Sequence, residues 1–182
     1  FLNFSGMTIP DFNVYGAEIQ HRILKWLSIP IGIGFAPTKA LSKVANKIAK
    51  KFPERTNGIY VIDTEEKRIK ALKWTKIEDV WGIGFRLTKK MQAKNIKTAY
   101  DFTLPHNESF IRKEMGVVGM RLKYELEGKS VLEMEEPKAK KNIAVTRSFE
   151  KDITDFNELK ERVVTFASVC SEKLRKQNSC CN

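Results

Sequence analysis

The sequence has no apolar run as long as the roughly 20 residues that cross a bilayer as a helix. It also lacks a signal peptide, because its start, Phe1-Leu2-Asn3-Phe4, carries neither a charged region nor a cleavage signature. We therefore expect a cytoplasmic protein with no membrane partner. The chain does not begin with Met, which predicts that it is a trimmed or processed part of a longer protein.

Cysteine and histidine are scarce. The three cysteines, Cys170, Cys180 and Cys181, lie near the C-terminus without a Cys-x-x-Cys spacing, and the two histidines are far from them in the sequence. This pattern is typical of reduced thiols in a cytosolic protein and argues against a zinc site.

Acidic residues are outnumbered, since 33 Lys and Arg residues stand against 22 Asp and Glu residues, giving a net charge of +11. Such a surplus favours nucleic acid or another anionic surface as a partner, and a generally basic soluble protein is the alternative. Four lysines share one face of a helix expected over 37–51, namely Lys39, Lys43, Lys47 and Lys50. Like charges at this spacing repel, and a bound polyanion would relieve the repulsion; a solvated face is the other interpretation.

The most informative stretch is 78–102, with Trp81-Gly82-Ile83-Gly84 at its centre. Glycines allow a tight bend, and an amphipathic helix expected over 85–94 follows them. The first amides of that helix have no partners within it and form a site suited to phosphate. Its outer face is cationic, with Arg86, Lys89, Lys90 and Lys94. The pattern resembles a helix-hairpin-helix, which holds DNA backbone without sequence preference; an ordinary corner between helices is the alternative.

The order of the other patterns predicts an α+β protein. Strands are expected at 1–4, 31–36 and 58–62, with helices over 11–27 and 37–51, so residues 1–64 form part of a helix-covered sheet. Residues 65–128 are predicted to be all-helical, with helices near 65–72, 85–94, 99–103, 108–115 and 118–127. Residues 129–142 form a linker. Residues 143–182 hold one strand, 143–149, and one helix, 156–176, which is too little to close a core.

Three segments in this order resemble the Y-family DNA polymerases, the translesion enzymes, and most closely their bacterial UmuC branch. They are residues 32–51 (GIGFAPTKALSKVANKIAKK), residues 79–102 and residues 146–176, which begin Thr-Arg-Ser-Phe. The resemblance implies a partial palm at 1–64 and a thumb with the helix-hairpin-helix at 65–128. It also implies a truncated α+β little-finger domain at 143–182.

The resemblance implies roles for individual residues as well. Lys39 corresponds to a lysine that meets the triphosphate of the incoming nucleotide, a task to which a compact ammonium on a flexible stem is suited. Gly82, Ile83 and Gly84 match the hairpin that holds the duplex backbone. Arg147 lies where the little-finger sheet follows the template.

Y-family enzymes join nucleotides with two Mg²⁺ ions, which need convergent carboxylates. In the family an adjacent Asp-Glu pair supplies two of these groups, and Phe1-Leu2 matches the residues that follow the pair. The resemblance therefore implies that the catalytic carboxylates and the Mg²⁺ ions belong to the intact enzyme, upstream of Phe1. We expect this chain to hold no catalytic residue and no metal, to bind DNA weakly and to lack polymerase activity.

In the intact enzyme the expected partners are primer–template DNA and an incoming dNTP, in bacterial DNA repair and the SOS response at the nucleoid. A sliding clamp and accessory subunits cannot be assigned, because no clamp-binding segment of the family's type occurs in the sequence. Open strand edges in a partial palm favour a homodimer. Two other classes stay open, a non-enzymatic helix-hairpin-helix module that binds DNA and a basic structural or RNA-binding protein.

Overall fold

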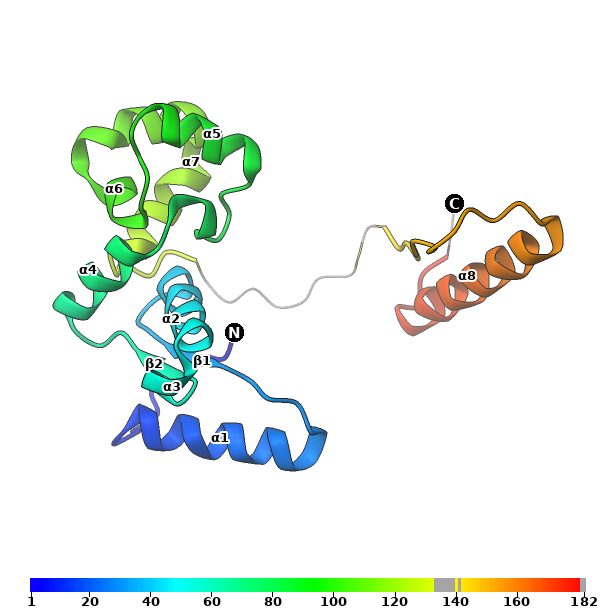
Figure 1. The fold of residues 1–182 in the computed structure, drawn as a ribbon, viewed down its shortest axis with the longest axis horizontal. Helices are drawn as coiled ribbons and strands as arrows, with labels where there is room; N and C mark the ends of the chain where they lie inside the picture. Colours follow the sequence, from blue (N-terminus) through cyan, green and yellow to red (C-terminus); the bar gives the residue numbers. More distant parts are fainter. Residues whose placement is uncertain (133–139, 141, 181–182) are drawn as a thin grey trace. The chain divides into compact units, whose positions relative to one another are not determined.

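The computed structural model describes residues 1–132, 140 and 142–180. The chain divides into two compact units, Phe1–Met134 and Glu135–Asn182 (Figure 1). Within the described ranges no helix is long and apolar enough to cross a membrane. Many helices accompany one small sheet, which agrees with the α+β class expected from the sequence. The segments expected as palm and thumb both lie in the first unit.

The sheet consists of two parallel strands. β1 (Ile33–Phe35) pairs with β2 (Ile59–Val61), with Ile33 opposite Ile59 and Phe35 opposite Val61. Helices α2 (Lys39–Lys51) and α3 (Pro53–Thr56) connect the strands, and α1 (Phe12–Leu27) packs against both. The expected strand at 1–4 is wrong, because these residues pair with no other segment in the part of the chain that the structure describes.

Helix α2 lies directly against the backbone of β1. A Cβ added at Gly34 would stand 2.2 Å from the backbone nitrogen of Asn46 and 2.5 Å from the carbonyl oxygen of Ser42. Only glycine fits at such an approach. The helix starts at Thr38, whose hydroxyl oxygen accepts a hydrogen bond from the amide of Leu41 at 3.3 Å. Its buried stripe contains Leu41, Val44, Ala45, Ile48 and Ala49, which recur at helical spacing.

The rest of the first unit is helical. Its elements are α4 (Glu65–Trp74), η1 (Ile77–Asp79), α5 (Phe85–Ala93), α6 (Ala99–Thr103), η2 (Pro105–Asn107) and α7 (Glu108–Leu126). Thr98 and Asp101 form a capping box at the start of α6. Asn95 adopts a left-handed φ of 59°, which ends α5. The core between these helices contains fully buried apolar side chains, among them Leu72, Ile77, Met91, Ile96, Phe102, Ile111 and Leu126.

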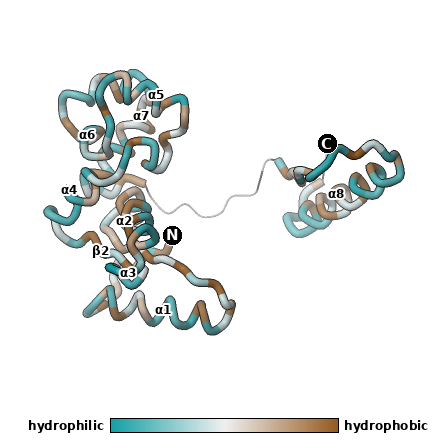
Figure 2. The backbone as a smooth tube through the Cα atoms, in the orientation of Figure 1, coloured by the Kyte–Doolittle hydropathy of each residue, from teal (hydrophilic) through white to brown (hydrophobic). Residues whose placement is uncertain are grey.

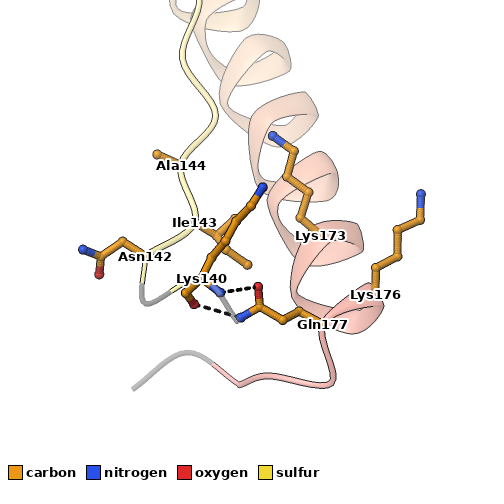
Figure 3. A pocket seen from close by; sticks show the side chains of 7 residues that line it. All are labelled: Lys140, Asn142, Ile143, Ala144, Lys173, Lys176 and Gln177. Carbon is orange, nitrogen blue, oxygen red and sulfur yellow. Dashed lines mark hydrogen bonds between the residues drawn. The ribbon is translucent and has the colours of Figure 1, made fainter. Parts of the chain in front are cut away.

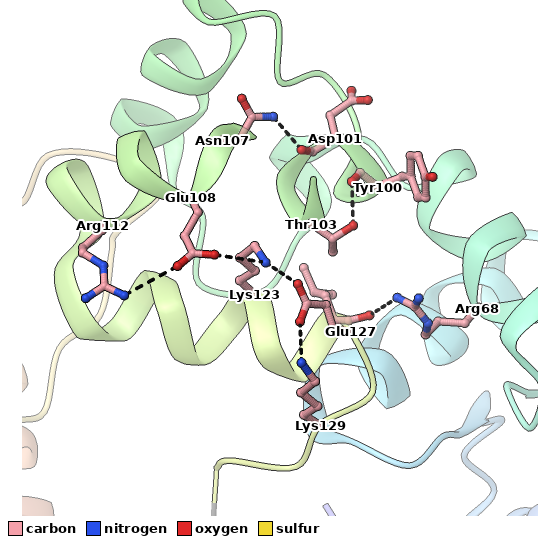
Figure 4. Close-up of polar contacts among 11 residues, drawn as sticks. Arg68, Tyr100, Asp101, Thr103, Asn107, Glu108, Arg112, Lys123, Glu127 and Lys129 are labelled. Atoms are coloured by element: carbon pink, nitrogen blue, oxygen red, sulfur yellow. Dashed lines mark hydrogen bonds and ion pairs between the residues drawn. The ribbon is translucent and has the colours of Figure 1, made fainter. Parts of the chain in front are cut away.

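Helix α7 is broken at Gly116, which has φ 60° and ψ −145°. The sequence predicts two helices here, and the break falls between them. Lys123, only 4% exposed, forms ion pairs with Glu108 before the break, at 3.7 Å, and with Glu127 beyond the end of α7 (Figure 4). Burial alone would raise the pKa of Glu127, but the hydrogen bonds and charges of Lys123 and Lys129 hold this pKa below its ordinary value. One buried ammonium thus holds both halves of α7 together.

Glu125 joins the two halves of the first unit, and its side chain has no exposed surface. One carboxylate oxygen, Oε2, accepts from the amide of Ala40 at 3.2 Å. The other, Oε1, accepts from the amides of Val131 at 2.9 Å and Leu132 at 3.0 Å. The backbone carbonyl of Glu125 accepts from the hydroxyl of Thr38 at 2.7 Å. The start of α2, the end of α7 and the segment after α7 therefore meet at one residue.

The second unit is built on α8 (Phe156–Lys176), whose bounds are those expected from the sequence. No residue of α8 is fully buried, and hydrophilic and hydrophobic residues alternate along it (Figure 2). The expected strand at 143–149 is wrong, because within the described residues it has no partner strand. The side-chain amide of Gln177 forms two hydrogen bonds with the backbone of Lys140. It donates to the carbonyl of Lys140 at 2.8 Å and accepts from the amide of Lys140 at 3.0 Å (Figure 3).

Candidate nucleic-acid interface

The turn at 81–84 connects η1 to α5 and contains two glycines with different roles. Ile83 is buried, and its amide donates to the carbonyl of Val80 at 3.0 Å, which closes the turn. Gly82 has φ +89°, a conformation that favours glycine. Gly84 has an ordinary φ of −88°, and a Cβ there would meet nothing within 4 Å. Gly82 therefore shapes the turn, and Gly84 leaves open space beside the start of α5.

The start of α5 is a suitable place for an anion. Gly84 is its N-cap, and no side chain caps the helix. The amides of Phe85, Arg86 and Leu87 therefore have no acceptor within the helix, and they lie at the positive end of its dipole. A phosphate that approached over Gly84 would meet these amides.

The predicted cations on α5 differ in their surroundings. Arg86 and Lys89 are exposed, and the ammonium of Lys89 lies 4.4 Å from the centre of the Phe85 ring. Lys90 forms an ion pair with Glu114 on α7, and this hydrogen bond together with the charge of Lys90 lowers the pKa of Glu114. Arg86 and Lys89 are therefore better placed than Lys90 to meet a phosphate.

Sequence reasoning placed a gap between the helices predicted over 108–115 and 118–127 but gave it no function; this gap is a second turn, at 115–119, where the chain passes through the Gly116 break and the second half of α7 begins. Two contacts show that α5 runs antiparallel to the first half of α7: Lys94 lies 5.9 Å over the Phe110 ring, and Lys90 pairs with Glu114. Because the contacts move toward the start of α5 as they move toward the end of the first half of α7, the start of α5 lies toward the second turn. A Cβ at Gly82 would also lie 4.0 Å from Leu122, which follows the second turn.

A signal for this second turn is present in the sequence. Gly116-Val117-Val118-Gly119 places two glycines around two apolar residues, much as the first turn alternates glycine with apolar residues. An exposed cation, Arg121, follows it. Both turns thus lead into a helix with positive charge nearby.

The lysine face of α2 extends toward the first turn. Lys43 lies 4.9 Å over the ring of Phe1, and this ring packs against Trp81 with 5.5 Å between centroids. Lys47 forms an ion pair with Asp79 on η1. Lys39, the first residue of α2, lies 5.9 Å over the same Phe1 ring. The structure thereby brings the predicted Lys39 and Trp81 onto neighbouring parts of the first unit.

The four lysines of α2 do not all serve one surface. Lys39, Lys43 and Lys50 line a cavity of about 1110 Å³ that also contains residues of β1 and the N-terminal segment. Lys47 turns to Asp79 instead. The remaining predicted residue, Arg147, is exposed in the second unit, on the segment before α8.

The described residues do not fit a two-metal site. Among residues 1–132, 140 and 142–180, no group of three or more His, Cys, Asp or Glu side chains could hold a metal ion. Asp63, at the end of β2, pairs with Lys67 at 2.8 Å, and this hydrogen bond lowers its pKa. The exposed Arg86 and Lys89 and the uncapped start of α5 form an arrangement suited to binding a polyanion.

Comparisons with known proteins show which proteins this chain is similar to. Residues 140–182 match the family model described as the impB/mucB/samB family C-terminal domain. Protein UmuC of Salmonella typhimurium is 38% identical over 172 residues, which are 94% of this chain and 40% of that protein. Protein MucB of Escherichia coli is 31% identical over 183 residues, 100% of this chain and 43% of that protein. DNA polymerase IV of Oceanobacillus iheyensis is 27% identical over 165 residues, 89% of this chain and 38% of that protein.

Proposed function

The chain belongs to the family of the UmuC, ImpB, MucB and SamB proteins, and we propose that it is part of a Y-family DNA polymerase that copies damaged templates during DNA repair. The relatives named DNA polymerase IV support this proposal. The chain spans about two-fifths of the length of these relatives, so the activity, its dNTP substrates and its two Mg²⁺ ions are proposed for the whole protein. No catalytic step is assigned to the described residues.

Within that protein, we propose that the first unit holds the backbone of primer–template DNA as a helix-hairpin-helix. The supporting observation is the 81–84 turn, where Gly82 at φ +89° presents the uncapped start of α5 beside the exposed Arg86 and Lys89. Backbone amides and long cationic side chains contact phosphates and carry no base readout. Binding is therefore expected to be insensitive to sequence and strongly dependent on salt.

Lys39 is proposed to meet the triphosphate of the incoming dNTP. It is the first residue of α2, so its side chain stands at the positive end of a helix, and it lines the cavity beside β1. The amides of Ala40 and Leu41 already donate to Glu125 and Thr38, so the proposal rests on the Lys39 ammonium, whose positive charge suits a triphosphate better than a neutral ligand.

A double charge reversal, Arg86→Glu with Lys89→Glu, tests the DNA contact. The variant is expected to bind a labelled duplex at least about tenfold more weakly, because two phosphate contacts are lost. The salt slope, which is the slope of the logarithm of the binding constant against the logarithm of the salt concentration, should become shallower by about one to two. Fluorescence anisotropy across a salt series measures both quantities.

The matched control reverses two exposed cations on α1, Arg22→Glu with Lys25→Glu, which leaves the turns intact. The control should keep most of its affinity. An equal loss in both variants would show that general basicity, and not this turn, binds DNA.

The 182-residue polypeptide is expected to bind primer–template DNA without extending the primer, because we propose that the metal-binding carboxylates lie elsewhere in the whole protein. A primer-extension assay with Mg²⁺ and all four dNTPs measures this. The whole protein should extend the primer in the same assay. Extension by the polypeptide alone contradicts the proposed location of the metals, and none by the whole protein favours a non-enzymatic DNA-binding module.

A further inference from the structure

Large apolar side chains are exposed at the tips of both turns. Phe85 is 75% exposed, Val117 68%, Val118 69% and Trp81 45%. The antiparallel register of α5 and the first half of α7 brings the two turns to the same end of the helices. These side chains are therefore close neighbours of the two helix starts and do not belong to the core.

Exposed cations follow both turns in the sequence. Arg86 and Lys89 follow the first turn and Arg121 follows the second, and all three are exposed. Exposed apolar patches rimmed by polar residues mark interaction sites. Positive charge beside an apolar patch favours a negatively charged partner. This partner should also have apolar surface between its charged groups.

Duplex DNA has such a surface, because deoxyribose rings separate the phosphates along the edges of the minor groove. We propose that Phe85, Val117 and Val118 pack against deoxyribose at this edge while the adjacent helix starts hold the phosphates. The inference rests on the proposed DNA-binding function and extends it to a salt-independent contact with the sugars.

The identity of the side chains favours sugar over unstacked bases. Single-strand binders use aromatic rings on which bases stack. Val117 and Val118 have no ring, the Trp81 ring packs against Phe1 with 5.5 Å between centroids, and the Lys89 ammonium lies 4.4 Å from the centre of the Phe85 ring. The position of Phe85 supports the contact as well, since it is the first residue of α5 and directly follows the open space at Gly84.

The test is a triple variant, Phe85→Ser, Val117→Ser and Val118→Ser, in the 182-residue chain. Apolar contacts release no counterions, so the variant is expected to bind duplex about tenfold more weakly at every salt concentration with an unchanged salt slope. A matched control, Val14→Ser with Leu24→Ser, removes comparably exposed apolar side chains from α1 and should bind like the parent. A single Phe85→Leu variant of the parent should keep most of the duplex affinity, because leucine still provides apolar packing without an aromatic ring.

The outcomes separate this inference from the proposed function. Unchanged duplex affinity in the triple variant, or a changed salt slope, overturns the inference while leaving backbone binding in place. An equal loss for single-stranded DNA also overturns it, because stacking on bases would explain the result. The inference is also overturned if the triple variant loses binding to anionic phosphatidylglycerol vesicles but binds duplex DNA like the parent. Failure of the parent chain to bind duplex, or no effect of reversing Arg86 and Lys89, contradicts the proposed function itself.

Discussion

A Glu125→Ala variant is expected to lower the free energy of unfolding by about 3–5 kcal/mol. The side chain is completely buried and accepts hydrogen bonds from the amides of Ala40, Val131 and Leu132. Removing the carboxylate leaves the buried amide of Ala40 and the partly buried amides of Val131 and Leu132 without this acceptor, and a buried unsatisfied donor costs about 1–3 kcal/mol. Water entering the space left by the side chain recovers part of the loss. Urea unfolding followed by tryptophan fluorescence measures the change.

Two further variants identify the cause. Glu66→Ala removes an exposed carboxylate from the first turn of α4 and should change stability by less than about 1 kcal/mol. Glu125→Gln keeps the shape but converts one oxygen into a donor. Hydrogen exchange should then show lost protection either at Ala40 or at Val131 and Leu132. A Glu125→Ala variant as stable as the Glu66→Ala variant would show that the hydrogen bonds contribute little.

A Gly34→Ala variant is expected to be destabilised by at least about 3 kcal/mol, at the upper end of the usual cost of overpacking. The added methyl group would stand 2.2 Å from the nitrogen of Asn46 and 2.5 Å from the oxygen of Ser42, and both are backbone atoms. Neither atom can move away as the end of a side chain can. The strand must therefore separate from α2, which opens the packing around Leu41 and Phe35.

The same substitution at Gly84 is the matched control, because a methyl group there has nothing within 4 Å and φ is −88°. The free energy of unfolding of Gly84→Ala should lie within about 0.5 kcal/mol of that of the parent. The stability of Gly32→Ala should lie between those of Gly34→Ala and Gly84→Ala, since a Cβ at Gly32 would stand 2.7 Å from the flexible side chain of Lys50. Thermal unfolding of the three variants gives the order, and equal midpoints for Gly34→Ala and Gly84→Ala contradict the close approach of α2.

Local patterns in the sequence predicted the helices well. The bounds of α6 and α8 agree with the expected ranges 99–103 and 156–176, and α5 ends one residue before the expected 94, because helix signals lie within a few residues of one another. Strands fared worse, because a strand needs a partner distant in sequence. Residues 1–4 and 143–149 have the composition of strands, yet within the described part of the chain neither segment pairs.

The contacts that join distant segments could not be predicted from the sequence. Glu125 alternates with apolar residues near the end of α7, and the sequence around it does not indicate that Ala40 and Leu132 donate hydrogen bonds to it. Lys47 belongs to the predicted lysine face but turns to Asp79. The second turn, by contrast, had a signal in Gly116 and Gly119, and only the register of α5 against α7 shows that it lies near the first.

The buried ammonium of Lys123 constrains how this sequence can evolve. It stands between Glu108 and Glu127, so removing it leaves Glu108 with Arg112 and Glu127 with Lys129 as their remaining partners, and removing either carboxylate leaves the buried ammonium with one partner fewer. A neutral replacement must therefore change several of these positions together. These positions are up to 19 residues apart and lie on both sides of the Gly116 break, so the effects of substituting them are coupled across the break.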